Sequence, residues 1–365
     1  MTIKHLVISG GGPTGFLTYG VASHLAKKDF WKLEDIKSIY GCSIGAYMGV
    51  VFSLGYEWEW LDDYFIKRPW EKLAASSAIK FTDINDKKCL INEHFQTEAI
   101  LPLLKAKDFD ETITLKELYE YNKIDIHLYA TNINTIKLQK IDISHTTHPD
   151  LLLITALQMT MAFPIIFQPI INEDKCYVDG GLLNHFPLND CINQQQCNPD
   201  EILAFKNILN NVNQCIDESS SIFDFMLILM KKMQSSLDGE VDQIEVKHIM
   251  SCLIDDLSGF DKWADALHSE ETRRNIIENG YNQAELFMSS ISNKVEIEVE
   301  ASEVEASEVE VEASEVEVEA SEVEVEASEV ELEASEVEVE ASEVEASEVE
   351  VEVEASEVEA SEVED

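Results

Sequence analysis

The sequence predicts an α/β protein of three layers, in which helices cover both faces of a central, mostly parallel sheet. Two observations carry this prediction. Short β-branched runs alternate with helical patterns in the first part of the chain, and glycine-rich turns follow the first two of these runs directly. The chain before its acidic C-terminal tail is long enough for one sizeable hydrophobic core with a small lobe attached.

The first elements follow from hydrophobic periodicity. Residues 5–9 predict a short buried strand, and after a glycine turn residues 16–27 have the spacing of a helix. Residues 36–40 predict a second strand, which runs into another glycine-containing turn and a helix that ends near Leu54. Residues 56–110 are rich in Trp and charge, and we interpret them as a helical lid or insertion without a clean strand.

The later elements are predicted in the same way. Thr114 and Glu117 give the capping-box signal of a helix that continues through Tyr121. Asp150 is a candidate cap for a helix over residues 151–161, which Pro164 follows. The other predicted elements are strands at residues 125–131, 135–143, 177–178 and 201–205, and helices at residues 222–233 and 261–288.

Composition divides the chain into a core of residues 1–205, C-terminal helices in residues 206–293, and a tail of residues 294–365. Between positions 295 and 365 the chain has 31 acidic residues and no Lys or Arg, and it repeats Ala-Ser-Glu-Val-Glu. Such a segment cannot bury enough apolar surface to offset the cost of ordering, so we expect it to be disordered. Of the 72 acidic residues, 41 remain in the body against 26 basic ones, a net charge of −15.

This acidic balance argues against nucleic acid as a partner and against anionic membranes, because both are polyanions. Transient contact with a neutral or zwitterionic membrane surface or micelle is compatible with it. The seven cysteines are odd in number and lack paired metal spacing, so we expect reduced thiols. With no signal peptide or transmembrane helix in the pattern, the sequence predicts an intracellular, cytoplasmic protein.

The first chemical motif is the glycine turn after the first strand, which contains Gly10, Gly11, Gly12 and Gly15. Consecutive glycines at a helix N-terminus let backbone amides point into one space and bind an anion. The spacing also fits a dinucleotide-binding turn, which requires an acidic residue at the end of the second strand. Glu34 and Asp35 precede that strand instead, which leaves nucleotide binding as the weakest alternative.

The second motif, Gly41-Cys42-Ser43-Ile44-Gly45, stands at the end of the second strand. It has the form of a nucleophile elbow, in which Gly41 and Gly45 permit a strained strand-to-helix turn that exposes the Ser43 hydroxyl. A buried, unreactive Cys42 is the favoured interpretation of its neighbour, and a reactive thiol is the alternative.

The third motif is Asp179-Gly180-Gly181, after a short strand. Because ligand sites collect at the carboxyl ends of parallel strands, we expect Asp179 in the same crevice as Ser43. An exposed Asp has a pKa of about 3.9, so burial has to raise the pKa of Asp179 if it is to accept the serine proton.

These three motifs, with Ala162-Phe163-Pro164 before the third, resemble the patatin-like phospholipase family over about residues 4–190. The resemblance implies a Ser–Asp dyad, with Ser43 as the acylated nucleophile and Asp179 as the base. It also implies that amides of the glycine turn form the oxyanion hole, and that the substrate is a lipid ester. The mechanism requires no metal or organic cofactor. Family members often carry a basic residue where this chain has Thr14, so a contact with a phospholipid phosphate is not implied.

Three alternatives remain open at the level of the sequence. His185 could complete a Ser-Asp-His triad, although it reads as part of a loop that leaves the site, and His248 and His268 sit on charged, helix-like segments. An acyltransferase would use the same residues, and an inactive lipid-binding module would keep only the fold. The aromatic residues Trp58, Trp60, Tyr64, Phe65 and Trp70 fit an acyl-chain wall and ordinary core packing equally well.

Overall fold

The computed structural model describes residues 2–209, 246–254 and 260–292, together with a few residues between 215 and 233. Most of the predicted helix at residues 222–233, and the whole predicted tail, lie outside these described residues. The chain divides into two units, residues 1–289 and 290–365, and the elements below belong to the first unit.

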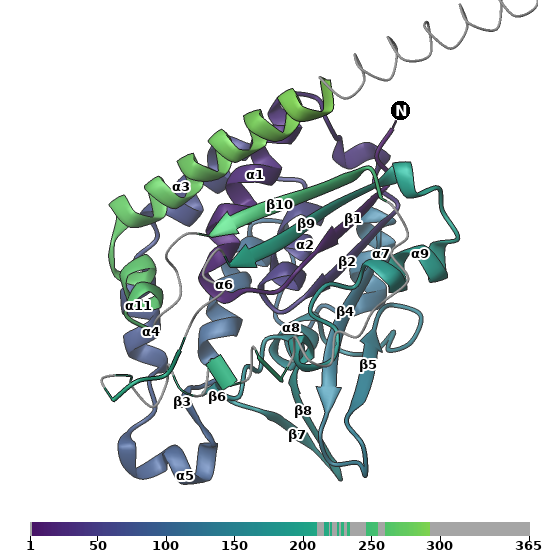
Figure 1. Cartoon of the computed structure of the whole chain (residues 1–365). Coiled ribbons are helices and arrows are strands. Elements are labelled where there is room, and N and C mark those ends of the chain that lie inside the picture. The colour runs from purple at the N-terminus through teal and green to yellow at the C-terminus, as the bar shows by residue number, and fades with distance from the viewer. Residues whose placement is uncertain are drawn as a thin grey trace, which may run out of the picture. The chain divides into compact units, whose positions relative to one another are not determined.

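A mixed sheet of eight strands forms the centre of the first unit (Figure 1). Five strands lie side by side and are parallel, in the order β10 (His248–Ile254), β9 (Ile202–Leu209), β1 (His5–Ile8), β2 (Ser38–Cys42) and β4 (Asp125–Asn132). The antiparallel strands are β5 (Gln139–Ile143), β7 (Ile170–Asn172) and β8 (Lys175–Asp179). The predicted α/β class with a mostly parallel sheet is thereby confirmed.

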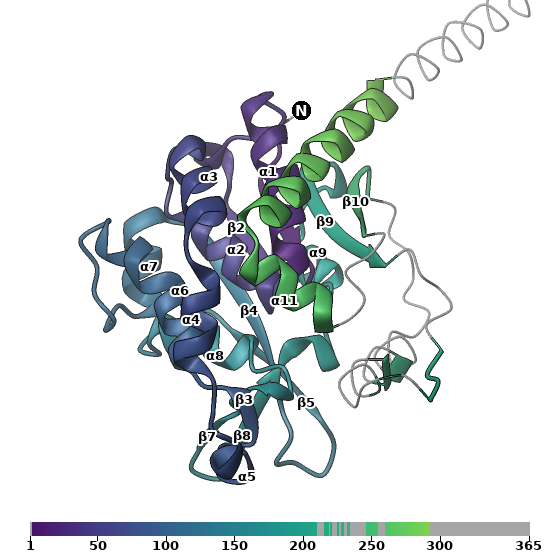
Figure 2. The same ribbon diagram turned by 90° about the vertical axis from the view of Figure 1, so that its left-hand side faces the viewer.

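Helices flank both faces of the sheet, and they do so unequally. Leu6 and Ile8 of β1 point into the large core, whereas Val7 packs on the opposite face with Cys191 of α9 (Leu188–Gln195). Figure 2 shows the more heavily covered side. The helices of the large core include α1 (Gly15–Lys27), α2 (Ile44–Ser53), α3 (Trp58–Lys67), α4 (Trp70–Ser77), α6 (His94–Lys105), α7 (Leu115–Asn122) and α8 (Leu153–Thr160).

The predicted lid region, residues 56–110, is mostly helical and includes the short α5 (Ile84–Lys87), but the prediction that it has no strand is wrong. Strand β3 (Cys89–Ile91) pairs in parallel with β6 (Ile165–Phe167) in a separate two-stranded sheet. A three-residue strand leaves too short a pattern for periodicity to reveal, and its partner is far away in the sequence.

One predicted helix cap is confirmed and another is wrong. The Thr114 side chain accepts a hydrogen bond from the Glu117 amide, and the Glu117 carboxylate accepts one from the Thr114 amide, so the predicted capping box forms at α7. By contrast, α8 begins after Leu152 and is not capped by Asp150. The Leu115 amide bonds to the Leu151 carbonyl at 3.0 Å, which holds the chain extended until Leu152.

The predicted helix over residues 261–288 is broken at Ser269, into α11 (Phe260–His268) and a helix over residues 270–292. Arg273 explains how the break is tolerated. Its buried guanidinium donates to the carbonyls of Ala266 and Leu267 at the end of α11, and to those of Ile66 and Arg68 at the end of α3. Carbonyls that the break leaves without helical partners are therefore satisfied.

Among the described residues, the helices are all too short or too polar to cross a bilayer.

Candidate active site

Two strands that run toward each other bring the predicted site together. Strand β2 lies along the first part of β4, where Cys42 is opposite Tyr129, and β8 lies along the last part of the same edge, where Asp179 is opposite Ala130. The two strands thus end at consecutive residues of β4. Because β8 is antiparallel to β4, the expectation that Asp179 ends a parallel strand is wrong. Asp179 still lies next to Ser43, because β4 extends beyond the end of β2 and gives β8 an edge to pair with.

Ser43 has the backbone conformation expected of a nucleophile elbow. Its φ of 54° and ψ of −126° fall in a region that residues with a Cβ seldom adopt, and α2 begins directly after it. Gly45 makes the turn possible, since a Cβ there would lie 2.3 Å from the Ile8 carbonyl oxygen. Gly41 is equally confined, against the backbone of Ala46. The hydroxyl is therefore held at the N-terminus of a buried helix.

A residue that the sequence did not single out anchors this turn. The Ser43 amide donates to the hydroxyl oxygen of Thr160 at 3.0 Å, and that hydroxyl donates to the Tyr129 carbonyl at 2.6 Å. Thr160 is fully buried at the end of α8. A buried polar residue at the end of a mostly apolar helix was the one signal for it, and that signal is common in ordinary cores.

Asp179 is buried, with 2% of its surface exposed, and it is held by short hydrogen bonds. Its Oδ1 accepts from the Gly181 amide at 2.8 Å, and its own amide donates to the Ala162 carbonyl at 3.0 Å. The Cys42 thiol lies 3.8 Å from the same Oδ1. Gly180 allows the close approach to β4, because a Cβ there would lie 2.1 Å from the Tyr129 carbonyl oxygen.

The environment of Asp179 makes it a stronger base than an exposed aspartate. Burial raises its pKa to about 6, although contacts with the Ser43 hydroxyl, the Gly181 amide and the Cys42 thiol favour the ionised form. Its Oδ2 is shielded from solvent and accepts no hydrogen bond of ordinary geometry from the described residues. The Ser43 contact is therefore looser than a full hydrogen bond, as is common in active sites before the substrate binds.

Only part of the glycine turn offers free amides. The Gly10 amide donates to the His185 carbonyl at 3.1 Å, and the Gly15 amide donates to carbonyls within the turn. Within the described part of the chain, the amides of Gly11 and Gly12 have no protein acceptor, and φ is positive at both residues, at 152° and 60°. Gly10 and Gly15 were predicted as part of the oxyanion hole as well, but their amides already donate to carbonyls that build the turn.

Asn207 of β9 also holds the turn, and sequence reasoning missed it. Its amide donates to Ser9 Oγ and its side-chain Nδ2 donates to the Gly10 carbonyl, both at 2.8 Å. The carbonyl of Gly10 is therefore fixed by β9, and its amide is fixed by the loop that contains His185. Asn207 lies in a strand that the sequence predicted only as far as residue 205, so nothing pointed to it.

His185 lies at the site, contrary to the expectation that its loop leaves it. The position that a Cβ would take on Gly10 is 3.0 Å from the His185 ring and 3.4 Å from Ser43 Cβ. The ring is also close to Gly181, beside Asp179. The other two histidines are elsewhere: His248 is buried at the start of β10, where we expected a charged helix, and His268 is exposed at the end of α11.

The aromatic group supports the core more than the site. Phe65 and Trp70 are buried and make edge-on contacts with Phe16 of α1, and Trp58 packs against Tyr19. Trp60 alone of this group is well exposed. A cavity lined by Trp31, Phe52 and Trp58 lies beyond the C-terminal end of α2, whereas Ser43 lies at the N-terminal end. That cavity is therefore not where a chain esterified at Ser43 would lie.

The environment of Cys42 fits the interpretation of a buried, unreactive thiol. Its side chain is fully buried, and burial raises the pKa of its thiol well above the usual range. A neutral thiol of this kind acts as a small apolar side chain next to the elbow.

Potential metal ligands gather away from Ser43. Within the described part of the chain, His5, Cys191 and Cys197 form the one group whose ligand atoms lie close enough together. His5 begins β1, and the glycine turn follows its other end.

Two curated viral proteins are similar to this chain. "Probable lipid hydrolase 463L" of Invertebrate iridescent virus 6 is 25% identical over 221 residues, which cover 59% of this chain and 73% of the relative. "Uncharacterized protein R571" of Acanthamoeba polyphaga mimivirus is 24% identical over 186 residues, covering 51% of this chain and 60% of the relative.

Solved structures with a similar arrangement include VipD from Legionella pneumophila, at 15% identity and a TM-score of 0.43, with 80% of this chain and 67% of that chain covered. The type III effector protein ExoU matches at 12% identity and a TM-score of 0.38, covering 80% of this chain and 53% of that chain. The family model described as patatin-like phospholipase matches residues 6–192, just over half of the chain. The chain therefore belongs to the patatin-like phospholipase family.

Proposed function

We propose that this chain is a lipid acyl hydrolase in which Ser43 is the nucleophile and Asp179 is the base. The observation that carries the proposal is the meeting of β2 and β8 at Tyr129 and Ala130, which brings the strained serine turn and a buried carboxylate together. Membership of the family, and the name of the iridescent virus relative, support a lipid ester as the substrate.

The first half of the proposed reaction forms an acyl-enzyme. As Ser43 Oγ attacks the ester carbonyl carbon, its proton passes to the Asp179 carboxylate, and the carbonyl oxygen becomes an oxyanion. The amides of Gly11 and Gly12 donate to that oxyanion, where each donor is worth about 10²-fold to 10³-fold in rate. The intermediate then collapses, the bond to the alcohol oxygen breaks, and the leaving alcohol takes the proton from Asp179.

The second half releases the acid. Water attacks the acyl carbon and gives its proton to Asp179, and the bond to Ser43 Oγ then breaks as that oxygen regains the proton. The raised pKa of Asp179, about 6, suits a group that must accept and return a proton near neutral pH. No base other than Asp179 is needed for the proton balance, so we assign His185 to the wall of the site.

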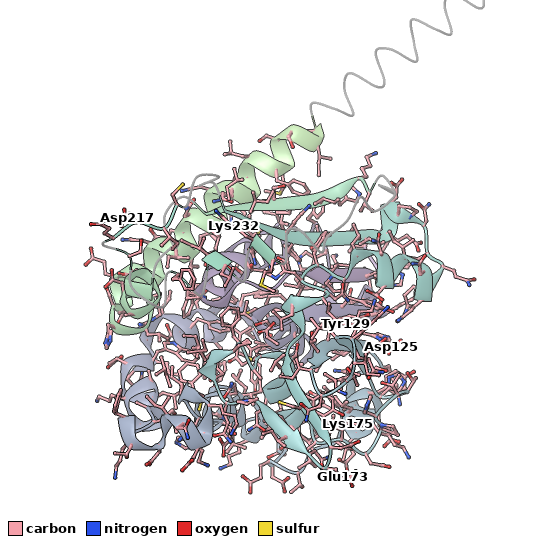
Figure 3. All side chains as sticks on the ribbon, turned by 60° about the horizontal axis from the view of Figure 1, so that its bottom comes forward. Asp125, Tyr129, Glu173, Lys175, Asp217 and Lys232 are labelled. Carbon is pink, nitrogen blue, oxygen red and sulfur yellow. The ribbon has the colours of Figure 1, made fainter. Side chains whose placement is uncertain are left out.

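Two neighbouring hairpin tips supply a surface for contact with lipid. The tip after β4 and the tip between β7 and β8 are joined by bonds from the Ile133 amide to the Cys176 carbonyl and from the Asn134 side chain to the Asp174 carbonyl. Glu173 and Lys175 mark the second tip in Figure 3. Exposed aliphatic side chains gather on these hairpins: Ile133, Ile136, Leu138 and Ile171.

We propose that this hairpin surface touches a neutral or zwitterionic lipid layer. It lies beyond the end of β2, the strand that Ser43 directly follows. Exposed aliphatic side chains lose their contact with water when they enter a lipid layer, at a gain of about 25 cal/mol per Å².

Hydrolysis assays with matched variants test the assignment. We expect Ser43→Ala and Asp179→Asn to lose at least about 10³-fold in kcat/KM on phospholipid, lysophospholipid, glyceride and short-ester substrates, while His185→Ala keeps most of it. Far-ultraviolet circular dichroism and melting temperature serve as the folding control. An active Asp179→Asn beside an inactive His185→Ala would overturn the dyad in favour of a triad-like arrangement.

A further inference from the structure

A second cluster of reactive side chains lies at the opposite end of β1 from the glycine turn. His5 stands at the start of β1, Cys191 is in α9, and Cys197 follows the left-handed residue that ends that helix. One ligand atom from each of the three lies within 4.8 Å of the other two. Cys191 and Cys197 are only six positions apart, but His5 joins them only through the fold, which is why the cysteines seemed to lack metal spacing in the sequence.

The size of the cluster fits a small ion that prefers sulfur and nitrogen. In a tetrahedral zinc site the metal–sulfur distance is about 2.3 Å and the metal–nitrogen distance about 2.0 Å, which places the ligand atoms roughly 3.5–3.8 Å apart. The separations of up to 4.8 Å in this cluster therefore need to close by about 1 Å.

His5 is already oriented as a metal ligand would be. Its Nδ1 is 2.7 Å from the hydroxyl of Ser38, its neighbour in the parallel register of β1 and β2. Metal-bound histidines usually have the second ring nitrogen fixed in this manner by a polar partner. Nε2 is then the nitrogen that is left for an ion.

The surroundings exclude hard cations and admit a soft one. The three side chains border the smaller core, with Val7, Ile202 and Ala204 as apolar neighbours. Cys191 is fully buried and Cys197 is partly exposed, so the cluster has one side that an ion and a water molecule can reach. Thiolate and imidazole ligands in such a setting select Zn²⁺ and Cu⁺ over Mg²⁺ or Ca²⁺.

We propose that His5, Cys191 and Cys197 bind one thiophilic d¹⁰ metal ion, Zn²⁺ with a water as its fourth ligand or three-coordinate Cu⁺. The ion fastens α9 to the first strand of the sheet. Since α9 directly follows the segment that runs from Asp179 at the end of β8 through His185, the ion stabilises that connection and takes no part in ester chemistry. The inference does not depend on the activity of Ser43.

Metal titration of the metal-free, reduced full chain tests this site. Co²⁺ is the spectroscopic substitute for zinc, because thiolate–cobalt charge-transfer bands report sulfur ligands directly, and competition with Zn²⁺ and Cu⁺ separates the two candidates. We expect one ion per chain, and an increase in melting temperature at saturating metal. Cys215→Ser is the matched control, since Cys215 is an exposed thiol outside the cluster.

The ligand variants give distinct outcomes. Cys191→Ser and Cys197→Ser should each abolish the charge-transfer bands and the thermal stabilisation, while Cys215→Ser retains both. Ser38→Ala should weaken binding by about 10-fold to 100-fold, because it removes the partner of His5 Nδ1. Ser38→Ala also guards against misfolding of the cysteine variants, since it leaves all three ligands present.

Three results would overturn the site. The first is metal binding that Cys215→Ser removes and the cluster variants keep. The second is an intact, reduced wild-type chain that shows no thiolate–cobalt bands. The third is mass spectrometry that finds Cys191 and Cys197 joined in a disulfide without any bound metal.

Discussion

At the scale of single residues, Thr160 is the least expected participant in the site. It accepts from the Ser43 amide and donates to the Tyr129 carbonyl, so it connects the elbow to the strand that both site strands share. It does not touch the reacting atoms, and we regard it as a positioning residue. The Ser43 turn is strained, and a strained turn persists only when its neighbours hold it.

We therefore expect Thr160→Val to lower kcat by about 10-fold to 100-fold with little change in KM, because the substrate-binding surface stays the same and the nucleophile loses its alignment. Thr160→Ser keeps the hydroxyl and is the matched control, which should restore most of the rate. Steady-state kinetics on a soluble ester measure both. Equal loss in the two variants would mean that the methyl group, and not the hydroxyl, is what matters.

The raised pKa of Asp179 predicts how rate and stability depend on pH. The base form appears as pH rises through about 6, so kcat/KM on a soluble ester should rise tenfold per pH unit below 6 and level off above it. Stability has the opposite sign. The folded state keeps the Asp179 proton to a higher pH than the unfolded state does. The free energy of unfolding therefore falls as the pH rises from about 4 to about 6.

Replacement of Asp179 by Asn removes this ionisation. Above pH 6 the wild type buries an ionised carboxylate, which destabilises the fold, and Asn carries no charge. The variant should thus melt at a higher temperature than the wild type above pH 6, although its activity is lost. Thermal melts of the two chains at pH 5 and pH 8 provide the measurement. A variant that melts below the wild type at pH 8 would contradict a raised pKa.

The site residues that could be predicted from the sequence are those that lie within a short motif. The elbow around Ser43 and the Asp179-Gly180-Gly181 turn each lie within five residues of sequence, and the elbow takes the strained strand-to-helix turn that the sequence predicted. Thr160, Asn207 and His185 reach the site from other elements, and a threonine or asparagine in a buried element has no local mark of such a role. The same limit applied to Gly10, whose amide looked free until the His185 loop was placed beside it.

At the scale of elements, the meeting of β2 and β8 was beyond the reach of sequence patterns. Periodicity identified both strands, and it gave no direction for β8, since parallel and antiparallel strands of four or five buried residues look alike. Its short connection to β7 is the feature that fits an antiparallel hairpin. Helices with long periodic patterns, such as α1 and α2, were predicted within one or two residues.

The helix over residues 270–292 packs on α1 through glycine. A Cβ on Gly280 would lie 2.6 Å from the Leu17 carbonyl oxygen, and a Cβ on Gly20 would lie 2.3 Å from the Ile277 carbonyl oxygen. The two helix backbones are therefore in direct contact. In an open helix position Gly→Ala stabilises by about 1 kcal/mol, so the sign of the change is informative.

We expect Gly280→Ala to destabilise the fold by about 1–3 kcal/mol, because the added methyl group forces the two helices apart. Glu278→Ala, at an exposed position of the same helix, is the control and should have little effect. Denaturant unfolding of both variants gives the free energies. A Gly280→Ala chain more stable than the wild type would show that the helices do not approach this closely.

At the scale of the whole molecule, the proposed contact with lipid depends on the net charge of the body and on the hairpin surface. The body carries a net negative charge, so Coulombic attraction does not draw it to anionic lipid. The exposed aliphatic side chains of the two tips provide the alternative attraction. Ile136 is fully exposed and is the most prominent of them.

Ile136→Glu should reduce hydrolysis of phosphatidylcholine vesicles by about fivefold or more and leave hydrolysis of a soluble short ester unchanged, since only the first requires contact with a lipid surface. Leu286→Glu is the control, an exposed aliphatic residue on the helix over residues 270–292. Vesicle co-sedimentation and the two assays measure the split. Equal effects of the two variants would remove the hairpin surface from the account.

The central claim is that a hydroxyl, a carboxylate and two amides act on the same acyl carbon. Mass spectrometry after treatment with a serine-directed fluorophosphonate tests it most directly. The account predicts one adduct per chain on Ser43, no adduct in Ser43→Ala, and labelling slowed by at least about 10²-fold in Asp179→Asn, with a melting temperature no lower than that of the wild type. An adduct on a different residue, or labelling of Asp179→Asn at the wild-type rate, would contradict it.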